Sequence, residues 1–186
     1  MKYNMVVIGT STGGMTALQT IFACFPADFP LPVTIVIHRG KESAEHLTRL
    51  LQKNCHLPVK EIEDKMPIDS GKIFLAPPEY HVLVDQDNFS LSIDEPVHYA
   101  RPSIDVLFES AAAIFTNKLV GIILTGAGQD GAEGLVEIKR RGGFTIVQEP
   151  ASAECGILPK AAIDKGDVDK ILRLEEIGDF LCQLSE

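Results

Sequence analysis

The sequence predicts an α/β fold: a doubly wound, mostly parallel sheet with helices on both faces and a small antiparallel hairpin. Three observations predict it. Short apolar runs alternate with longer segments whose apolar residues recur at helical spacing. The short runs are continuously apolar, which is typical of parallel strands buried on both faces. One segment in the middle instead alternates apolar and polar residues, which indicates two antiparallel strands.

Composition and charge limit the class of protein. The 186 residues, 45% hydrophobic and 23% charged, suit one globular domain, so we expect a single domain over residues 1–186. The net charge of −9 argues against nucleic acid as a partner and against binding to anionic membrane surfaces, because both need basic surface. No apolar stretch approaches the roughly 20 residues of a membrane span, so we expect a protein that is not membrane-inserted.

The four cysteines form no CxxC pair and show no metal-ligand spacing. The start of the chain has no cleavage-site pattern of a signal peptide. We therefore expect reduced thiols, a cytoplasmic location, no metal and no cofactor. The sequence leaves the oligomeric state open.

The first half of the chain is predicted to alternate strands and helices. Gly9 follows the first apolar run, and Pro26 stops the first helical stripe. Ser43 is suited to cap the second helix. The predicted elements are strand Met5–Ile8, helix Met15–Phe25, strand Val33–Ile37 and helix Ser43–Cys55.

The second half returns to the same alternation after a hairpin around Asp85–Asn88. Ser103 is the expected N-cap of the helix after the hairpin, and glycines end two later helices. The predicted elements are strand Lys72–Ala76, hairpin strands Tyr80–Val84 and Phe89–Ile93, helix Ile104–Phe115, strand Leu119–Leu124, helix Ala132–Arg141, strand Phe144–Val147, helix Ile157–Lys165, strand Lys170–Leu174 and helix Ile177–Leu184.

The carboxyl ends of the predicted strands are where a doubly wound fold places its site. Ser11 follows the first strand in the pattern Gly9-x-Ser11-x-Gly13, His38 follows the second, and Asp130 lies in the loop after Leu119–Leu124. Neighbouring strands lie about 4.8 Å apart, so side chains at these ends can meet. The three residues predict a Ser–His–Asp hydrolase, in which the serine attacks a carbonyl, the histidine moves the proton and the aspartate orients the histidine.

Each of these residues has a structural alternative. The loop of Ser11 is also suited to a plain glycine-rich turn or a phosphate cradle. His38 could be a structural histidine at a strand end. Asp130 could be the N-cap of the helix that follows it.

A dinucleotide-binding domain is the main alternative for the whole chain. Gly126, Gly128 and Gly131 have the spacing of a dinucleotide fingerprint, and Glu149 ends the next strand. Against it, Asp130 would place a negative charge beside the pyrophosphate, and Ser11 and His38 would have no role.

Five segments, in order, resemble the catalytic domain of the bacterial chemotaxis protein-glutamate methylesterases, the CheB family. They are Ile8–Gly14, Val36–His38, Phe74–Pro78, Arg101–Phe108 and Leu124–Ala132. The resemblance runs from about Val6 to Lys165. It implies hydrolysis of γ-glutamyl methyl esters on methylated chemotaxis receptors with release of methanol, and it leaves open whether particular receptor glutamines are deamidated as well.

The resemblance also implies roles for single residues. It assigns the catalytic serine, histidine and aspartate to Ser11, His38 and Asp130, and a supporting role beside the serine to Thr12. The expected oxyanion donors are backbone N–H groups near Thr12, Gly13 and Ala127. Arg39 and Arg101 are the candidate substrate-binding residues, because they could place positive charge against acidic receptor helices.

The chain also departs from the family pattern. Arg39 stands where the family usually has methionine in a Gln-His-Met-Pro-like run, and Ala127 stands where methionine is common. These departures leave open a catalytically weak signalling module of the same fold. Family members commonly carry an N-terminal receiver domain, whereas this sequence is expected to hold the methylesterase-like domain without one.

Overall fold

The computed structural model describes residues 2–38 and 44–185. Within these ranges, seven parallel strands form one sheet in the order β3-β4-β2-β1-β7-β8-β9. A separate antiparallel pair joins β5 (His81–Val84) and β6 (Phe89–Ser92). The parallel strands are β1 (Met5–Thr10), β2 (Val33–Ile37), β3 (Val59–Glu61), β4 (Ile73–Leu75), β7 (Leu119–Ile123), β8 (Phe144–Gln148) and β9 (Lys170–Leu172).

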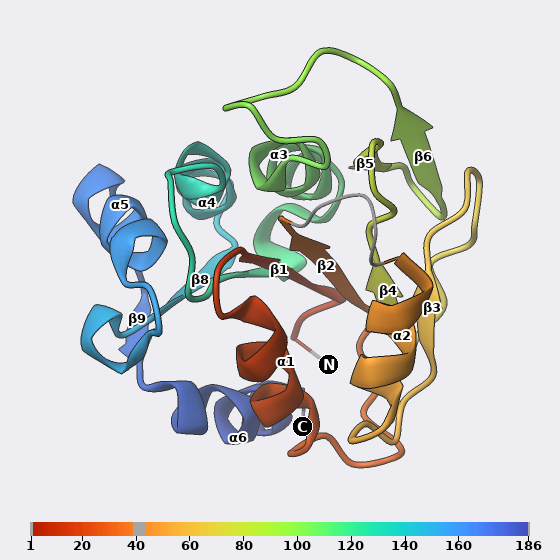
Figure 1. Cartoon of the computed structure of the whole chain (residues 1–186), viewed down its shortest axis with the longest axis horizontal. Coiled ribbons are helices and arrows are strands. Elements are labelled where there is room, and N and C mark those ends of the chain that lie inside the picture. Colours follow the sequence, from red (N-terminus) through yellow and green to blue (C-terminus); the bar gives the residue numbers. More distant parts are fainter. Residues whose placement is uncertain (1, 39–43, 186) are drawn as a thin grey trace.

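Helices cover both faces of the sheet (Figure 1). One face carries α1 (Gly14–Phe22), α2 (Ala44–Gln52) and α6 (Leu174–Ser185). The other carries α3 (Ile104–Phe115), α4 (Ala132–Arg140) and α5 (Ile157–Lys165), with the β5–β6 hairpin packed beside α3. Two short 3-10 turns, Thr116–Lys118 and Pro150–Ser152, complete the described elements.

The central strands β1, β2 and β7 are buried throughout because each of their faces meets a different core. Val6 and Ile8 of β1 belong to the core under α1, whereas Met5 and Val7 belong to the core under α3. This is the period of two that side chains follow along a strand. The continuous apolar runs of the sequence therefore mark strands that are covered on both sides.

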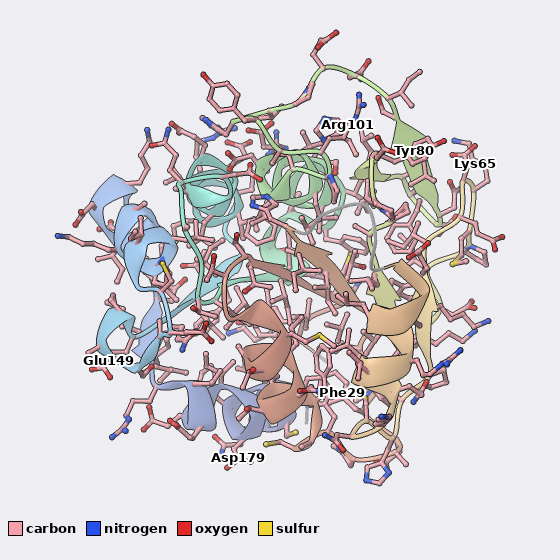
Figure 2. All side chains as sticks on the ribbon, viewed as in Figure 1. Phe29, Lys65, Tyr80, Arg101, Glu149 and Asp179 are labelled. Atoms are coloured by element: carbon pink, nitrogen blue, oxygen red, sulfur yellow. The ribbon has the colours of Figure 1, made fainter. Side chains whose placement is uncertain are left out.

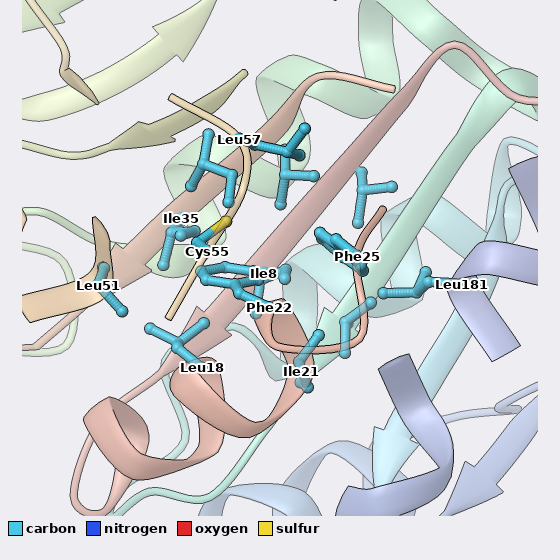
Figure 3. Close-up of a cluster of buried hydrophobic side chains, with 14 of the residues drawn as sticks. Ile8, Leu18, Ile21, Phe22, Phe25, Ile35, Leu51, Cys55, Leu57 and Leu181 are labelled. Carbon is cyan, nitrogen blue, oxygen red and sulfur yellow. The ribbon is translucent and has the colours of Figure 1, made fainter. Parts of the chain in front are cut away.

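The core under α1 is rich in aromatic side chains. Figure 3 shows Phe22 and Phe25 beside Ile8 of the sheet and near Leu181 of α6. Phe22 and Phe25 are no more than 1% exposed. Burial of each such side chain contributes about 2–3 kcal/mol, so this layer is a main source of stability.

The predicted fold class is confirmed, and the differences concern element ends and one missed strand. β3 was not predicted, because it has three residues and the side chain of its central Lys60 is exposed. The helix α6 begins at Leu174, three residues before the predicted start, and β9 accordingly ends at Leu172. Ser103 is the N-cap of α3, as expected, and its hydroxyl accepts a hydrogen bond from the Val106 N–H. The predicted cap Ser43 lies outside the described residues.

The order of strands reverses direction between β1 and β7. From β1 the chain moves through β2 to β3 and β4 on one side, and later adds β7, β8 and β9 on the other. Such a reversal opens a crevice at the carboxyl ends of the two strands, where α/β folds place their ligands. None of the described helices is long and apolar enough to cross a membrane.

Candidate active site

Ser11 lies on a sharp turn between β1 and α1. Its N–H donates to the Thr125 carbonyl at 3.0 Å, and its own carbonyl accepts from Gly14 N–H at 2.9 Å. Gly13 has φ of +79°, a conformation that glycine adopts without strain. A side chain on Gly126 would stand 2.9 Å from Ser11 Cβ. Glycine at these positions therefore lets the turn lift Ser11 to the sheet edge while the β7 loop packs against it.

His38 lies beside this turn because β1 and β2 are in parallel register. Thr10 pairs with Ile37, so Ser11 and His38 are the next residue on each of two adjacent strands. The His38 N–H donates to the Thr10 carbonyl at 3.0 Å, which continues the ladder to the edge. Among the described residues, no hydrogen bond joins the Ser11 hydroxyl to the His38 ring.

Asp130 is the most highly coordinated side chain of the site. Its Oδ2 lies 2.7 Å from His38 Nε2 and accepts from Ile104 N–H at 2.7 Å. Its Oδ1 accepts from the Ser103 hydroxyl at 2.6 Å and from Asp105 N–H at 3.2 Å. The carboxylate is 3% exposed and sits against the N-terminus of α3, where unpaired N–H groups favour a negative charge.

The alternative role for Asp130, capping the helix that follows it, is wrong. The N-cap of α4 is Gly131, and no side chain caps that helix. Asp130 instead receives two backbone N–H groups from the start of α3, which lies 26 residues earlier in the chain. Only the folded structure brings that helix end to the loop, so sequence spacing could not show it.

These hydrogen bonds determine the charge of Asp130. Burial alone would raise the pKa of its carboxyl, but the hydrogen bonds from His38, Ser103 and Ile104 outweigh burial and lower the pKa. An ionised carboxylate only accepts hydrogen bonds, so His38 carries a proton on Nε2. In the neutral ring, Nδ1 is then the nitrogen with a lone pair available to accept a proton.

Two buried threonines fasten the site loops to each other. The Thr10 hydroxyl donates to the Thr125 carbonyl at 2.7 Å, and the Thr125 hydroxyl donates to the Thr12 carbonyl at 2.9 Å. Thr125 N–H in turn donates to the side-chain oxygen of buried Gln148 at 2.8 Å. These residues were not predicted from the sequence, although polar residues at the ends of buried strands could have indicated them.

The expected oxyanion donors lie on the loops after β1 and β7, which these hydrogen bonds join. Thr12 and Ala127 are exposed, and Gly13 is half-buried directly before α1. Within the described part of the chain, the N–H groups of these three residues donate no hydrogen bond. They are therefore available to an incoming acceptor.

Of the two candidate substrate-binding arginines, the structure describes only Arg101. Arg39 lies outside the described residues. Arg101 lies beside α3 and the hairpin (Figure 2), where its guanidinium donates to the Ile93 and Asp94 carbonyls at 2.8 and 3.0 Å. These bonds close the loop of residues 93–101, so Arg101 has a structural role there.

A hollow of about 470 Å³ lies at the opposite edge of the sheet. Its lining includes Tyr3, Asn4 and Pro32, which precede β1 and β2. It is therefore separate from Ser11, His38 and Asp130. Among residues 2–38 and 44–185, no group of three or more His, Cys, Asp and Glu side chains is arranged to hold a metal ion.

Known proteins resemble this chain in both sequence and fold. The family model described as CheB methylesterase matches residues 6–181. The crystal structure of the Thermotoga maritima CheB methylesterase catalytic domain superposes with a TM-score of 0.94 at 31% identity, covering 99% of this chain and 100% of that one.

Two curated relatives differ in length. A Leptospira interrogans protein (serovar copenhageni, strain Fiocruz L1-130), provisionally named protein-glutamate methylesterase/protein-glutamine glutaminase, is 46% identical over 187 residues, which is 100% of this chain and 97% of the relative. The protein-glutamate methylesterase/protein-glutamine glutaminase of Trichodesmium erythraeum (strain IMS101) is 35% identical over 98% of this chain but only 53% of its own length. The chain thus spans nearly all of one relative and about half of the other. It belongs to the CheB methylesterase family.

Proposed function

We propose that this protein hydrolyses γ-glutamyl methyl esters on methylated chemotaxis receptors, with Ser11 as nucleophile, His38 as general base and acid, and Asp130 as the orienting carboxylate. The observation that carries the proposal is the 2.7 Å contact between His38 Nε2 and Asp130 Oδ2, one strand away from Ser11. Membership of a methylesterase family supplies the substrate class.

The first half of the reaction transfers the acyl group to the enzyme. Ser11 Oγ attacks the γ-carbonyl carbon while its proton passes to His38 Nδ1. The C–O bond to the methoxy group then breaks, and the leaving oxygen takes the proton from His38 to depart as methanol. A glutamyl ester of Ser11 remains.

The second half regenerates the enzyme. A water molecule gives a proton to His38 Nδ1 and attacks the same carbonyl carbon. The bond to Ser11 Oγ breaks, and His38 returns the proton to that oxygen. The receptor glutamate is released as a carboxylic acid that loses its proton to solvent, and the enzyme is unchanged.

Both steps develop negative charge on the carbonyl oxygen. The free N–H groups of Thr12, Gly13 and Ala127 are the proposed donors to that oxygen, and the start of α1 adds a favourable dipole. Each such donor is typically worth about 10²–10³-fold in rate. The same chemistry deamidates glutamine if ammonia leaves in place of methanol, which fits the paired activities in the relatives' names.

The cytoplasm is the proposed location. All four cysteines are free thiols, as expected in a reducing compartment. Arg39 and Arg101 remain the proposed contacts to acidic receptor helices. For Arg101, such a contact has to use donors other than those bound to the loop carbonyls.

Methanol release from methylated receptor membranes tests the proposal. The wild-type protein should release methanol, and Ser11→Ala should lower the rate by at least about 10³-fold. Ser70→Ala is the matched control, because Ser70 is exposed and precedes β4 at the opposite edge of the sheet. Full activity in Ser11→Ala would refute the serine mechanism. No release by the wild-type protein would favour the signalling-module alternative.

A further inference from the structure

Asp105 is a second buried carboxylate directly behind Asp130. It lies in the first turn of α3 and is 3% exposed. Its backbone N–H donates to Asp130 Oδ1 at 3.2 Å, and its side-chain Oδ1 accepts from Gly134 N–H of α4 at 2.6 Å. Asp105 therefore joins the starts of two helices at the point where Asp130 is held.

The second oxygen of Asp105 is poorly satisfied. Among the described residues, no hydrogen bond reaches its Oδ2, which is fully buried. His98 Nε2 lies 3.5 Å from it and can supply a positive charge. His98 comes from the loop of residues 93–101 and has φ of +49°, a conformation that is costly for a residue with a side chain.

The charge of Asp105 is consequently sensitive to its surroundings. Burial and, to a lesser degree, the nearby charge of Asp130 raise the pKa of Asp105 to about 6, against the lowering effects of the Gly134 N–H, the Gly131 N–H and, least of all, His98. Asp105 thus changes charge in the pH range where a histidine does, whereas the pKa of Asp130 is lowered.

We infer that Asp105 is a positioning residue of the proposed active site, whose charge acts through Asp130 on the ability of His38 to take up a proton, with His98 as its counter-charge. This inference rests on the proposed function for its role in catalysis, but the coupling between the two groups is a property of the free protein. An ionised Asp105 adds negative charge behind Asp130 and stabilises protonated His38. A neutral Asp105 lacks this negative charge, so protonated His38 is less stable.

Other titratable groups face the same region from the packed elements. His81 of β5 accepts from Ser103 N–H through Nδ1 at 3.2 Å and donates from Nε2 to the Glu95 carbonyl at 3.1 Å, so both ring nitrogens are engaged. Glu109 on α3 and Glu133 on α4 are exposed, and Glu133 pairs with Lys165. Screening by water weakens the effect of these exposed carboxylates on His38.

NMR titration of the His38 ring in the free protein tests the inference without any substrate. Asp105→Asn keeps an oxygen that can accept from Gly134 N–H but removes the charge. We expect the midpoint of the His38 ring titration to move to lower pH, because the negative charge that stabilises the protonated ring is gone. Asp164→Asn, the same change on the exposed face of α5, should leave that midpoint unchanged. Equal shifts in the two variants would overturn the inference.

The wild-type protein provides a test that does not depend on the variant folding. The His38 resonance should show a second inflection near the pH at which the Asp105 carboxyl carbon titrates. His98→Gln should raise that pH, because it removes the counter-charge. A single His38 inflection unaffected by His98→Gln would contradict the inference.

Activity measurements then separate this inference from the proposed function. In Asp105→Asn, the acidic limb of the kcat/KM profile should move to lower pH together with the His38 titration. An inactive wild-type protein whose His38 still responds to Asp105 would refute the proposed function and leave the coupling intact. An active wild-type protein whose His38 does not respond to Asp105 would refute the inference and leave the proposed function intact.

Discussion

The two helical layers cover the same sheet, but they bury different kinds of side chain near the site. Under α1, α2 and α6 the contacts are aromatic: Phe25 stacks on Phe29 with ring centres 4.2 Å apart and lies 5.5 Å from Phe22. At the start of α3 the buried side chains are polar, with Asp130 receiving four hydrogen bonds. The first layer therefore mainly supplies stability, while the second holds the geometry on which the proposed chemistry depends.

The largest expected effect is the loss of activity on substitution of Asp130, among the polar side chains at the start of α3. Asp130→Asn replaces an acceptor-only carboxylate with an amide that faces four donors, so the tautomer and orientation of His38 are lost. We expect methanol release to fall by about 10³–10⁴-fold. Far-ultraviolet circular dichroism should show that the variant still folds. Retention of more than a tenth of the activity would contradict the role given to Asp130.

A substitution in the aromatic cluster under α1 should instead lower stability and leave activity nearly unchanged. Phe22→Ala leaves a cavity among fully buried side chains and should lower the free energy of unfolding by about 3–5 kcal/mol. Urea unfolding measures this loss. The folded fraction of the variant should keep kcat within about threefold of the wild type, since none of the site side chains belongs to this cluster. A large loss of kcat would show that the two layers are not separable.

Asp105 and Asp130 should change the free energy of unfolding in opposite directions as the pH changes. The pKa of Asp105 is about 6 in the folded protein against a usual value of 3.8, so the folded state binds more protons between these values. Stability from this group therefore falls as pH rises from about 4 to 6, by roughly 2 kcal/mol. Asp130 has a lowered pKa and acts oppositely, losing its contribution as pH falls below its usual range.

Urea unfolding of the wild type and of Asp105→Asn at several pH values checks this sign. The stability of the wild type relative to the variant should decrease between pH 4 and pH 7. A relative stability that rises over this interval would show that burial does not control the charge of Asp105.

The smallest expected effect concerns the loop of residues 93–101. Arg101→Ala removes two hydrogen bonds from a partly exposed guanidinium to loop carbonyls, so stability should fall by about 1 kcal/mol or less. Hydrogen exchange at the loop amides should rise while that of α3 stays unchanged. If the KM for methylated receptor also rises, Arg101 contributes to substrate binding as well as to loop closure.

Most of the fold could be predicted because its pattern is local. Continuous apolar runs marked the strands, and Ser103 marked the start of α3 through its capping chemistry. The strand β3 escaped notice because three residues carry too little pattern. Its pairing with β4 depends on the rest of the sheet rather than on its own sequence.

The residues of the site likewise could be predicted from the sequence only in part. Ser11, His38 and Asp130 could be named because each directly follows, or lies in the loop after, a strand of one sheet, and parallel strands end at a common edge. Thr10 and Thr125 could not, because their hydrogen bond joins residues 115 positions apart. Asp105 resembles any acidic residue of a first helical turn, and only its burial against Asp130 and α4 makes it unusual.

A double-mutant cycle on methanol release tests most directly whether Ser11 and Asp130 work as one unit through His38. The rates of wild type, Ser11→Ala, Asp130→Asn and the double variant are compared on the same methylated receptor preparation. If the carboxylate serves only the serine's proton transfer, the double variant should be no slower than Ser11→Ala alone. A double variant slowed by the product of the two single effects would mean that the groups act independently, and the proposed mechanism would be wrong.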